Sequence, residues 1–129
     1  MPTFIRNHKK LTALLIGAFA LLAFGGYQLA APIHGWLAAE FDLMRGHYEI
    51  LAVGLPAPWA PEFNRLLRER YGIKERAVAG CAISQSLADY VGTYNRTIMR
   101  AANRRFGHDI FQETVAIASS NWRSQHPPR

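Results

Sequence analysis

The longest run of apolar positions in the chain extends from Leu11 to Ala31 and contains no charged residue. At the rise of an α-helix this run is about 31 Å long, which matches the hydrocarbon core of a bilayer. Tyr27, near its far end, is of a residue type that is enriched at the headgroup interface. The pattern therefore predicts a transmembrane helix over residues 11–31.

The same run could be the apolar part of a signal peptide, because Arg6, Lys9 and Lys10 precede it. It is longer than the 7–15 apolar residues that are typical of a cleaved signal. A cleavage site also needs small residues at alternate positions, whereas Leu29 lies two residues before Ala31. We expect a retained signal-anchor with a single pass.

The charges on the two sides of the run predict its orientation. The flank 1–10 is basic, whereas Glu40 and Asp42 precede Arg45, the first basic residue after the run. The positive-inside rule then places residues 1–10 in the cytoplasm and residues 32–129 outside it. In a bacterial cell that side is the periplasm.

Apolar positions continue at helical spacing after Pro32, which is well tolerated in a first helical turn. These positions are Trp36, Leu37, Phe41 and Met44, with Glu40 as the polar exception. They predict a juxtamembrane helix at 32–46. It either continues the anchor or lies along the membrane interface, where Trp36 is a suitable residue.

Residues 47–123 are expected to form one small domain. The pattern predicts a strand at His47–Leu55, a helix at Glu62–Tyr71 and a second strand at Lys74–Ile83. A strand–helix–strand unit of this length makes the two strands parallel. Two strands alone are a poor sheet, so a third strand from elsewhere in the chain or from another subunit would complete it.

Two further helices follow. The first is predicted at Leu87–Phe106 with Ser84 or Ser86 as its N-cap, and the second runs from Asp109 towards Trp122. Residues 124–129 are expected to form a flexible tail. The predicted fold class is α/β or α+β: a transmembrane helix, then a βαβ unit and two C-terminal helices.

Charge and cysteine content limit the functions to be considered. The net charge is +6, but three positive charges belong to the flank 1–10, which leaves +3 for residues 32–129. A mildly basic domain outside the cytoplasm does not indicate nucleic-acid binding. Cys81 is the only cysteine, so an intrachain disulfide is excluded.

Cys81 is the residue with the most reactive chemistry. We expect it to be a small apolar residue on a buried strand, as free cysteines commonly are. The alternative is a thiol nucleophile, since Cys81 lies near a strand end and just before a helix N-terminus. Such an enzyme needs a base, for which His108 and Asp109 are the candidates. Because no complete catalytic pattern is present, we do not expect an enzyme.

A metal site or cofactor is not expected either. His34, His47, Cys81 and His108 could bind a metal, but no two of them have the close spacing of a structural zinc motif. The sequence also has no phosphate-binding glycine loop and no HExxH helix.

The densest positive cluster consists of Arg96, Arg100, Arg104 and Arg105, of which the first three are one helical turn apart. The simplest interpretation is a solvated helix face. The alternatives are binding to anionic lipid headgroups or to an acidic patch on a partner.

Gly54–Trp59, with the sequence GLPAPW, lies where the first strand ends. Ligands of parallel α/β units collect at the carboxyl ends of strands, which makes Pro56, Trp59, Ser84 and Ser86 candidate ligand or partner residues. The simpler interpretation is that the prolines stiffen the crossover and Trp59 fills the core.

Two classes of function follow from these patterns. We prefer a membrane-anchored interaction module or accessory subunit, whose partners are the lipid bilayer and either another membrane protein or a second copy of the chain. The alternative is a small-ligand or thiol-dependent site around Gly54–Trp59 and Cys81.

Overall fold

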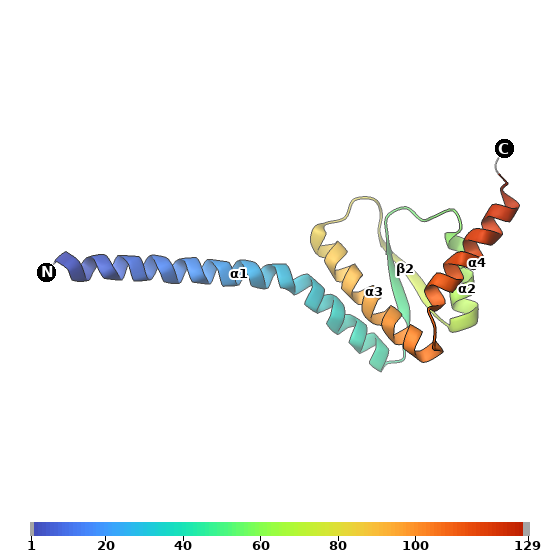
Figure 1. Cartoon of the computed structure of the whole chain (residues 1–129), viewed down its shortest axis with the longest axis horizontal. Coiled ribbons are helices and arrows are strands. Elements are labelled where there is room, and N and C mark those ends of the chain that lie inside the picture. Colours follow the sequence, from blue (N-terminus) through green and yellow to red (C-terminus); the bar gives the residue numbers. More distant parts are fainter. Residues whose placement is uncertain (1, 128–129) are drawn as a thin grey trace.

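The computed structural model of the chain describes the backbone of residues 2–127 and the side chains of residues 11–127. Within that range, four helices and a two-stranded parallel sheet form a mixed α/β architecture, and the first helix is the long N-terminal one (Figure 1). The predicted fold class is confirmed. In chain order the elements are α1 (Pro2–Met44), β1 (Glu49–Val53), α2 (Ala60–Tyr71), β2 (Lys74–Ala79), α3 (Gln85–Phe106) and α4 (Ile110–Gln125).

Helix α1 is continuous over 43 residues, with Pro32 inside it. Proline lacks the N–H that would bond to the carbonyl four residues earlier, and its ring crowds that carbonyl, so it bends a helix. Figure 1 shows this bend where the helix reaches the domain. The stretch predicted as a juxtamembrane helix is thus a continuation of the anchor. We call residues 11–31 the span and residues 32–44 the outer half of α1.

Among the described residues, α1 is the one helix long and apolar enough to cross a membrane, and its apolar stretch extends from Leu11 to Met44. In the span every leucine, isoleucine and phenylalanine side chain is exposed. The side chains of the basic flank 1–10 lie outside the described part of the chain.

The βαβ unit forms as predicted, with β1 and β2 parallel and Leu51 paired to Arg76. Helix α2 connects them and ends at Gly72, whose φ of 70° is a left-handed conformation that glycine adopts without a steric penalty. Strand β2 ends at Ala79, earlier than the predicted Ile83, because Gly80 and the residues after it leave the ladder.

Both C-terminal helices begin at the predicted caps. Ser84, and not Ser86, accepts a hydrogen bond from the backbone of Leu87 at 3.2 Å. The side chain of Asp109 accepts hydrogen bonds from the backbone N–H groups of Phe111 and Gln112 at 3.1 Å each. Because α4 continues to Gln125, the first residues of the predicted tail 124–129 are helical, and residues 128–129 lie outside the described range.

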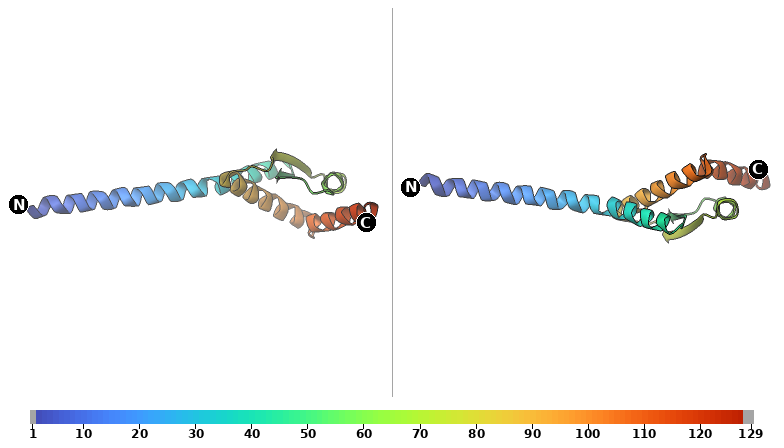
Figure 2. Two further views of the ribbon diagram at one scale, coloured as in Figure 1. Left: turned by 90° about the horizontal axis from the view of Figure 1, so that it is seen from above. Right: turned by 90° about the horizontal axis from the view of Figure 1, so that it is seen from below.

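The domain has two hydrophobic clusters. The distal cluster joins α2, α4 and the end of α3, and its largest members are Phe63, Leu66, Leu67, Ile73, Ile110 and Phe111. The apolar side of α2, with Phe63, Leu66 and Leu67, is buried against α4 as well as against the sheet. The proximal cluster joins α1, β1 and α3 through Ala39, Leu51, Val91, Tyr94 and Ile98. In Figure 2 the sheet and α2 lie on one side of the domain and α3 and α4 on the other, so each cluster joins the two sides.

The outer half of α1 is part of this domain. Gly35 is buried against α3, and a Cβ atom there would lie 2.3 Å from the backbone oxygen of Tyr90. One helical turn later Ala39 is fully buried. The hydroxyl of Tyr94 donates a 2.6 Å hydrogen bond to Asp42. The domain is thus fixed to the helix that carries the span.

Candidate functional site

The free edge of β1 is closed by a side chain of α3. The amide oxygen of Asn95 accepts a hydrogen bond from the backbone N–H of Leu51 at 2.8 Å. The amide nitrogen of Asn95 donates to the carbonyl of the same Leu51 at 2.7 Å. One side chain therefore occupies both backbone groups that a neighbouring strand would need at this position.

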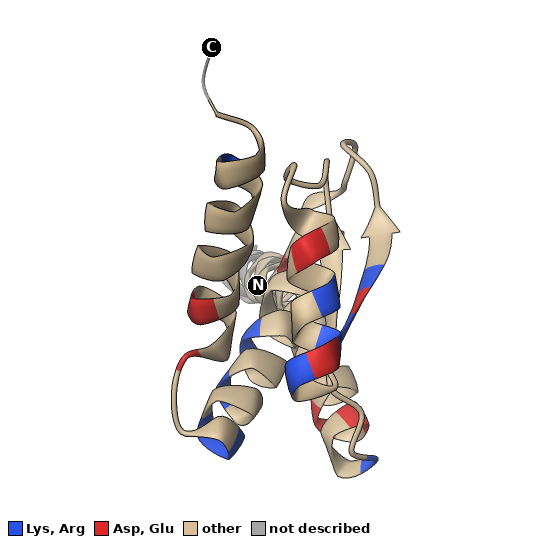
Figure 3. Cartoon of the chain, turned by 90° about the vertical axis from the view of Figure 1, so that its right-hand side faces the viewer, with Lys and Arg blue, Asp and Glu red and all other residues tan. Residues whose placement is uncertain are grey.

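The outer edge of β2 is open in the described part of the chain. Lys74 donates its backbone N–H to the carbonyl of Tyr48, towards β1. Because backbone groups alternate in direction along a strand, those of Glu75 and Ala77 point away from β1. The sheet consists of β1 and β2 alone, and β2 forms its outer border in Figure 3. A further strand would be added at this edge.

A groove of about 270 Å³ lies at the carboxyl end of β1 and includes residues of this edge strand. It is lined by Ala52 and Val53 of β1, by Glu75 and Ala77 of β2, and by the 54–57 turn with Trp59 and Phe63. Leu55 projects from the turn with 81% of its surface exposed. The groove is mainly apolar, so it suits an aliphatic or aromatic side chain.

Of the predicted strand-end residues, Pro56 and Trp59 line this groove, whereas Ser84 and Ser86 do not. The rings of Trp59 and Phe63 meet edge to face with their centroids 5.8 Å apart. Trp59 is half-buried, so it both packs on the distal cluster and contributes to the groove wall. Ser84 and Ser86 line a shallow depression beside His34 of α1.

The expectation that Cys81 is buried on a strand is wrong. Cys81 is exposed and follows β2 rather than belonging to it. A dyad with His108 and Asp109 is also excluded, because Cys81 lies before α3 and His108 lies after it. The 22 residues of α3 are about 33 Å long, which is far beyond the reach of a hydrogen bond.

The predicted arginine cluster is exposed along α3, as a solvated face would be. Arg96 donates to the hydroxyl of Thr93 at 3.1 Å, which is a contact within its own helix. Arg100 and Arg104 line a shallow depression with His108. Figure 3 shows several positive positions along α3, and positive and negative positions together on α2 and β2.

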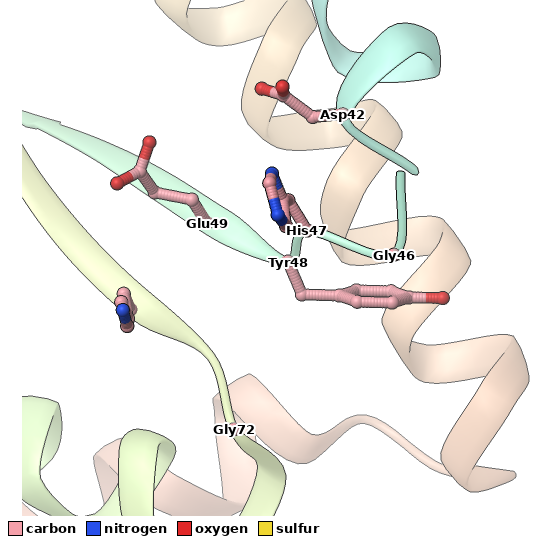
Figure 4. Close-up of a pocket in the computed structure, with 7 residues that line it drawn as sticks. Asp42, Gly46, His47, Tyr48, Glu49 and Gly72 are labelled. Carbon is pink, nitrogen blue, oxygen red and sulfur yellow. The ribbon is translucent and has the colours of Figure 1, made fainter. Parts of the chain in front are cut away.

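A second cavity, of about 260 Å³, lies at the opposite end of the strands and is polar (Figure 4). Asp42, His47, Glu49 and Lys74 line it. Glu49 binds the guanidinium of Arg76 at 3.0 Å, and this hydrogen bond raises the pKa of Arg76. Among the described residues no three His, Cys, Asp or Glu side chains come together as a metal site.

Some of the residues that line the groove or form the two sheet edges could not be identified from the sequence. Asn95 follows Tyr94 on α3 with no local motif that reveals a bond to a strand. Glu75 and Ala77 appear only as members of a strand, because which edge stays open depends on where α3 packs. Pro56 and Trp59 were found because a proline-rich turn after a strand is a recognisable signal.

Comparison of the chain with family models, with curated proteins and with solved structures finds no match.

Proposed function

We propose that the chain is a single-pass membrane protein with its N-terminus in the cytoplasm, and that its outer domain is an interaction module or accessory subunit. The docking element is the open edge of β2 together with the apolar groove beside it. The partner is an extended segment of another membrane-associated protein, which adds to the sheet as a third strand.

The observation that carries this proposal is the difference between the two edges of the sheet. Asn95 closes the edge of β1, whereas the backbone groups of Glu75 and Ala77 on β2 have no strand beside them in the described residues. A two-stranded sheet is marginal in water, and an added strand supplies backbone hydrogen bonds. Alternate side chains of that strand reach the groove, which supplies specificity.

The connection between α1 and the domain also supports the proposal. Because α1 passes from the span into the proximal cluster as one helix, the domain is held at a set orientation to the membrane. A docking edge fixed near a membrane meets partners in the same membrane at high effective concentration. Weak strand addition is then sufficient for a stable complex.

The orientation in the membrane rests on the charge difference between residues 1–10 and the residues after the span. We expect a reporter that is active only in the cytoplasm to be inactive when fused after Arg129, and active when fused before Met1. Activity of the C-terminal fusion, or a mature protein that begins near residue 32, would contradict the proposed topology.

The docking edge is tested by replacing Ala77 in two ways in the full chain. Ala77→Pro removes the outward N–H without removing a ladder bond to β1, whereas Ala77→Thr adds similar bulk and keeps that N–H. Proteins should be recovered in mild detergent from cells that express each variant. We expect a stoichiometric partner with the original chain and with Ala77→Thr, and its loss with Ala77→Pro.

Two results would contradict this account. Equal recovery of the partner with all three chains would mean that it binds elsewhere. Failure to recover any stoichiometric protein with the original chain would argue against an interaction module. Circular dichroism of the purified variants checks that each is folded.

A further inference from the structure

The outer half of α1 carries an exposed apolar stripe. Five large side chains are between 49% and 77% exposed there: Ile33, Trp36, Leu37, Phe41 and Met44. Because they recur at intervals of three and four residues, they lie along one side of the helix. The opposite side packs on α3 through Gly35 and Ala39. Glu40 is the one charged residue on this side, and an exposed strip that is otherwise apolar over this length marks a surface that is covered by something other than water.

The direction of this stripe identifies what covers it. In Figure 1 the sheet and α3 lie to the right of the outer half of α1, and the span leaves to the left. The face opposite α3 is therefore turned back towards the side that holds the span. The beginning of α3 lies at the same end of the domain, where Ser84 and Leu87 adjoin Ala31 and His34.

The residues on the border of the stripe suit the headgroup level of a bilayer. Trp36 is of a type enriched at that level. The guanidinium of Arg45 lies 4.5 Å from the ring centre of Phe41, so its aliphatic stem covers the ring while its charge stays accessible. Glu40, on the same side of the helix, favours the headgroup level over the hydrocarbon core, where a carboxylate is costly.

We infer that the occupant of the stripe is the bilayer that holds the span, and that the outer half of α1 lies along its surface. The inference rests on the membrane anchoring proposed above. A helix tilt of about 20° is average for spanning helices, and such a tilt brings the bent outer half closer to the membrane plane. The bilayer then covers one face of α1 while α3 covers the other, and the domain is held against the membrane.

The test places single spin labels on the full chain, reconstituted in phosphatidylcholine and phosphatidylglycerol vesicles. Cys81→Ser removes the native thiol, and cysteine replaces Leu37 in the stripe, Phe19 in the span or Glu69 on the exposed side of α2. Frequent collisions of a label with oxygen indicate that it lies in lipid, and frequent collisions with a water-soluble nickel complex indicate that it lies in water. We expect the ratio of oxygen to nickel collisions to be several-fold higher for label 37 than for label 69. The same ratio should be lower for label 37 than for label 19, because label 37 lies at a shallower depth in the bilayer.

Each other outcome overturns the inference in a distinct way. If label 19 is in lipid and label 37 is as water-accessible as label 69, the anchor stands and the surface contact is wrong. If label 37 is shielded from both reagents, a protein covers the stripe, such as a second copy of the chain. If label 19 itself is in water, the proposed anchor fails and the inference fails with it. A label at Ile33 repeats the measurement at a second stripe position.

Discussion

The two halves of α1 belong to one continuous helix and differ in packing. A Cβ atom added to Gly25 in the span would meet nothing within 4 Å, whereas one added to Gly35 would meet the backbone of Tyr90. Length and mean hydropathy do not locate the boundary, since the candidate span extends from Leu11 to Met44, although Glu40 and Asp42 lie only in the outer half. The difference teaches that the domain begins inside α1, where Gly35 and Ala39 pack against α3.

The distal cluster serves as a reference for the stability of the domain, because no residue of α1 belongs to it. Leu67 is fully buried there, so Leu67→Ala should lower the free energy of unfolding by about 2–5 kcal/mol. Arg68, on the exposed side of α2, should change it by no more than about 0.5 kcal/mol on replacement by Ala. Urea unfolding of the full chain in nanodiscs, followed by tryptophan fluorescence, measures both. Equal and near-zero costs would mean that α2 is not packed as described.

The two glycines of α1 test the comparison itself. Gly35→Ala should destabilise the domain by about 1–3 kcal/mol, because the neighbour that must move is backbone. Gly25→Ala should leave the unfolding of the domain within about 0.5 kcal/mol. The same urea experiment serves for both variants. A Gly35→Ala chain as stable as the Gly25→Ala chain would show that α1 and α3 do not approach each other this closely.

The hydrogen bond between Tyr94 and Asp42 ties α3 to the last turns of α1. Tyr94→Phe keeps the ring in the core and removes the hydroxyl, so it should cost about 0.5–1.5 kcal/mol at neutral pH. The carboxylate of Asp42 is half-exposed and regains water, which keeps the cost in the ordinary range. A loss above 3 kcal/mol in urea unfolding would contradict a single replaceable hydrogen bond.

The same tyrosine predicts a dependence on alkaline pH. Burial, and then the hydrogen bond to Asp42, raise the pKa of Tyr94 above its ordinary value of 10.0. An unfolded chain therefore releases this proton more readily than the folded chain, and the stabilisation is complete below about pH 10 and declines as pH rises further. Tyr94→Phe should make the alkaline decline of stability shallower. Unfolding curves between pH 8 and about pH 11 for both chains provide the measurement.

The smallest expected effect is at Cys81. Its exposure predicts rapid reaction with a thiol reagent at neutral pH in the folded protein. Because it packs in neither cluster, Cys81→Ser should change stability by no more than about 0.5 kcal/mol. If labelling is slow in the folded protein and becomes fast only in urea, Cys81 is buried, which contradicts this prediction.

Local sequence signals were sufficient for much of this fold. The βαβ unit and the start of α4 at Asp109 were predictable, and the cap of α3 was narrowed to Ser84 or Ser86, because each depends on a few neighbouring positions. The continuity of α1 was left open, since a proline after an apolar run begins a helix as readily as it bends one.

What could not be predicted depends on contacts between distant segments. Cys81 was expected in the interior because free cysteines commonly are, but the strand ends two residues before it. Asn95 closes the edge of β1 across 44 residues of sequence, and no local pattern encodes that bond. Only part of the groove could be predicted from the sequence. The turn around Pro56 is a local feature, whereas the contribution of β2 depends on how the two strands pair.

The central claim is that the span and the domain share one unbroken helix. Hydrogen exchange of the full chain in nanodiscs tests it most directly, by comparing the backbone amides of residues 33–43 with those of α3 around Val91 to Ile98. The account predicts that both sets exchange at similarly slow rates, because the outer half of α1 and α3 open only together. Fast exchange across residues 33–36, with α3 still protected, would show a hinge between the span and the domain and would contradict the account.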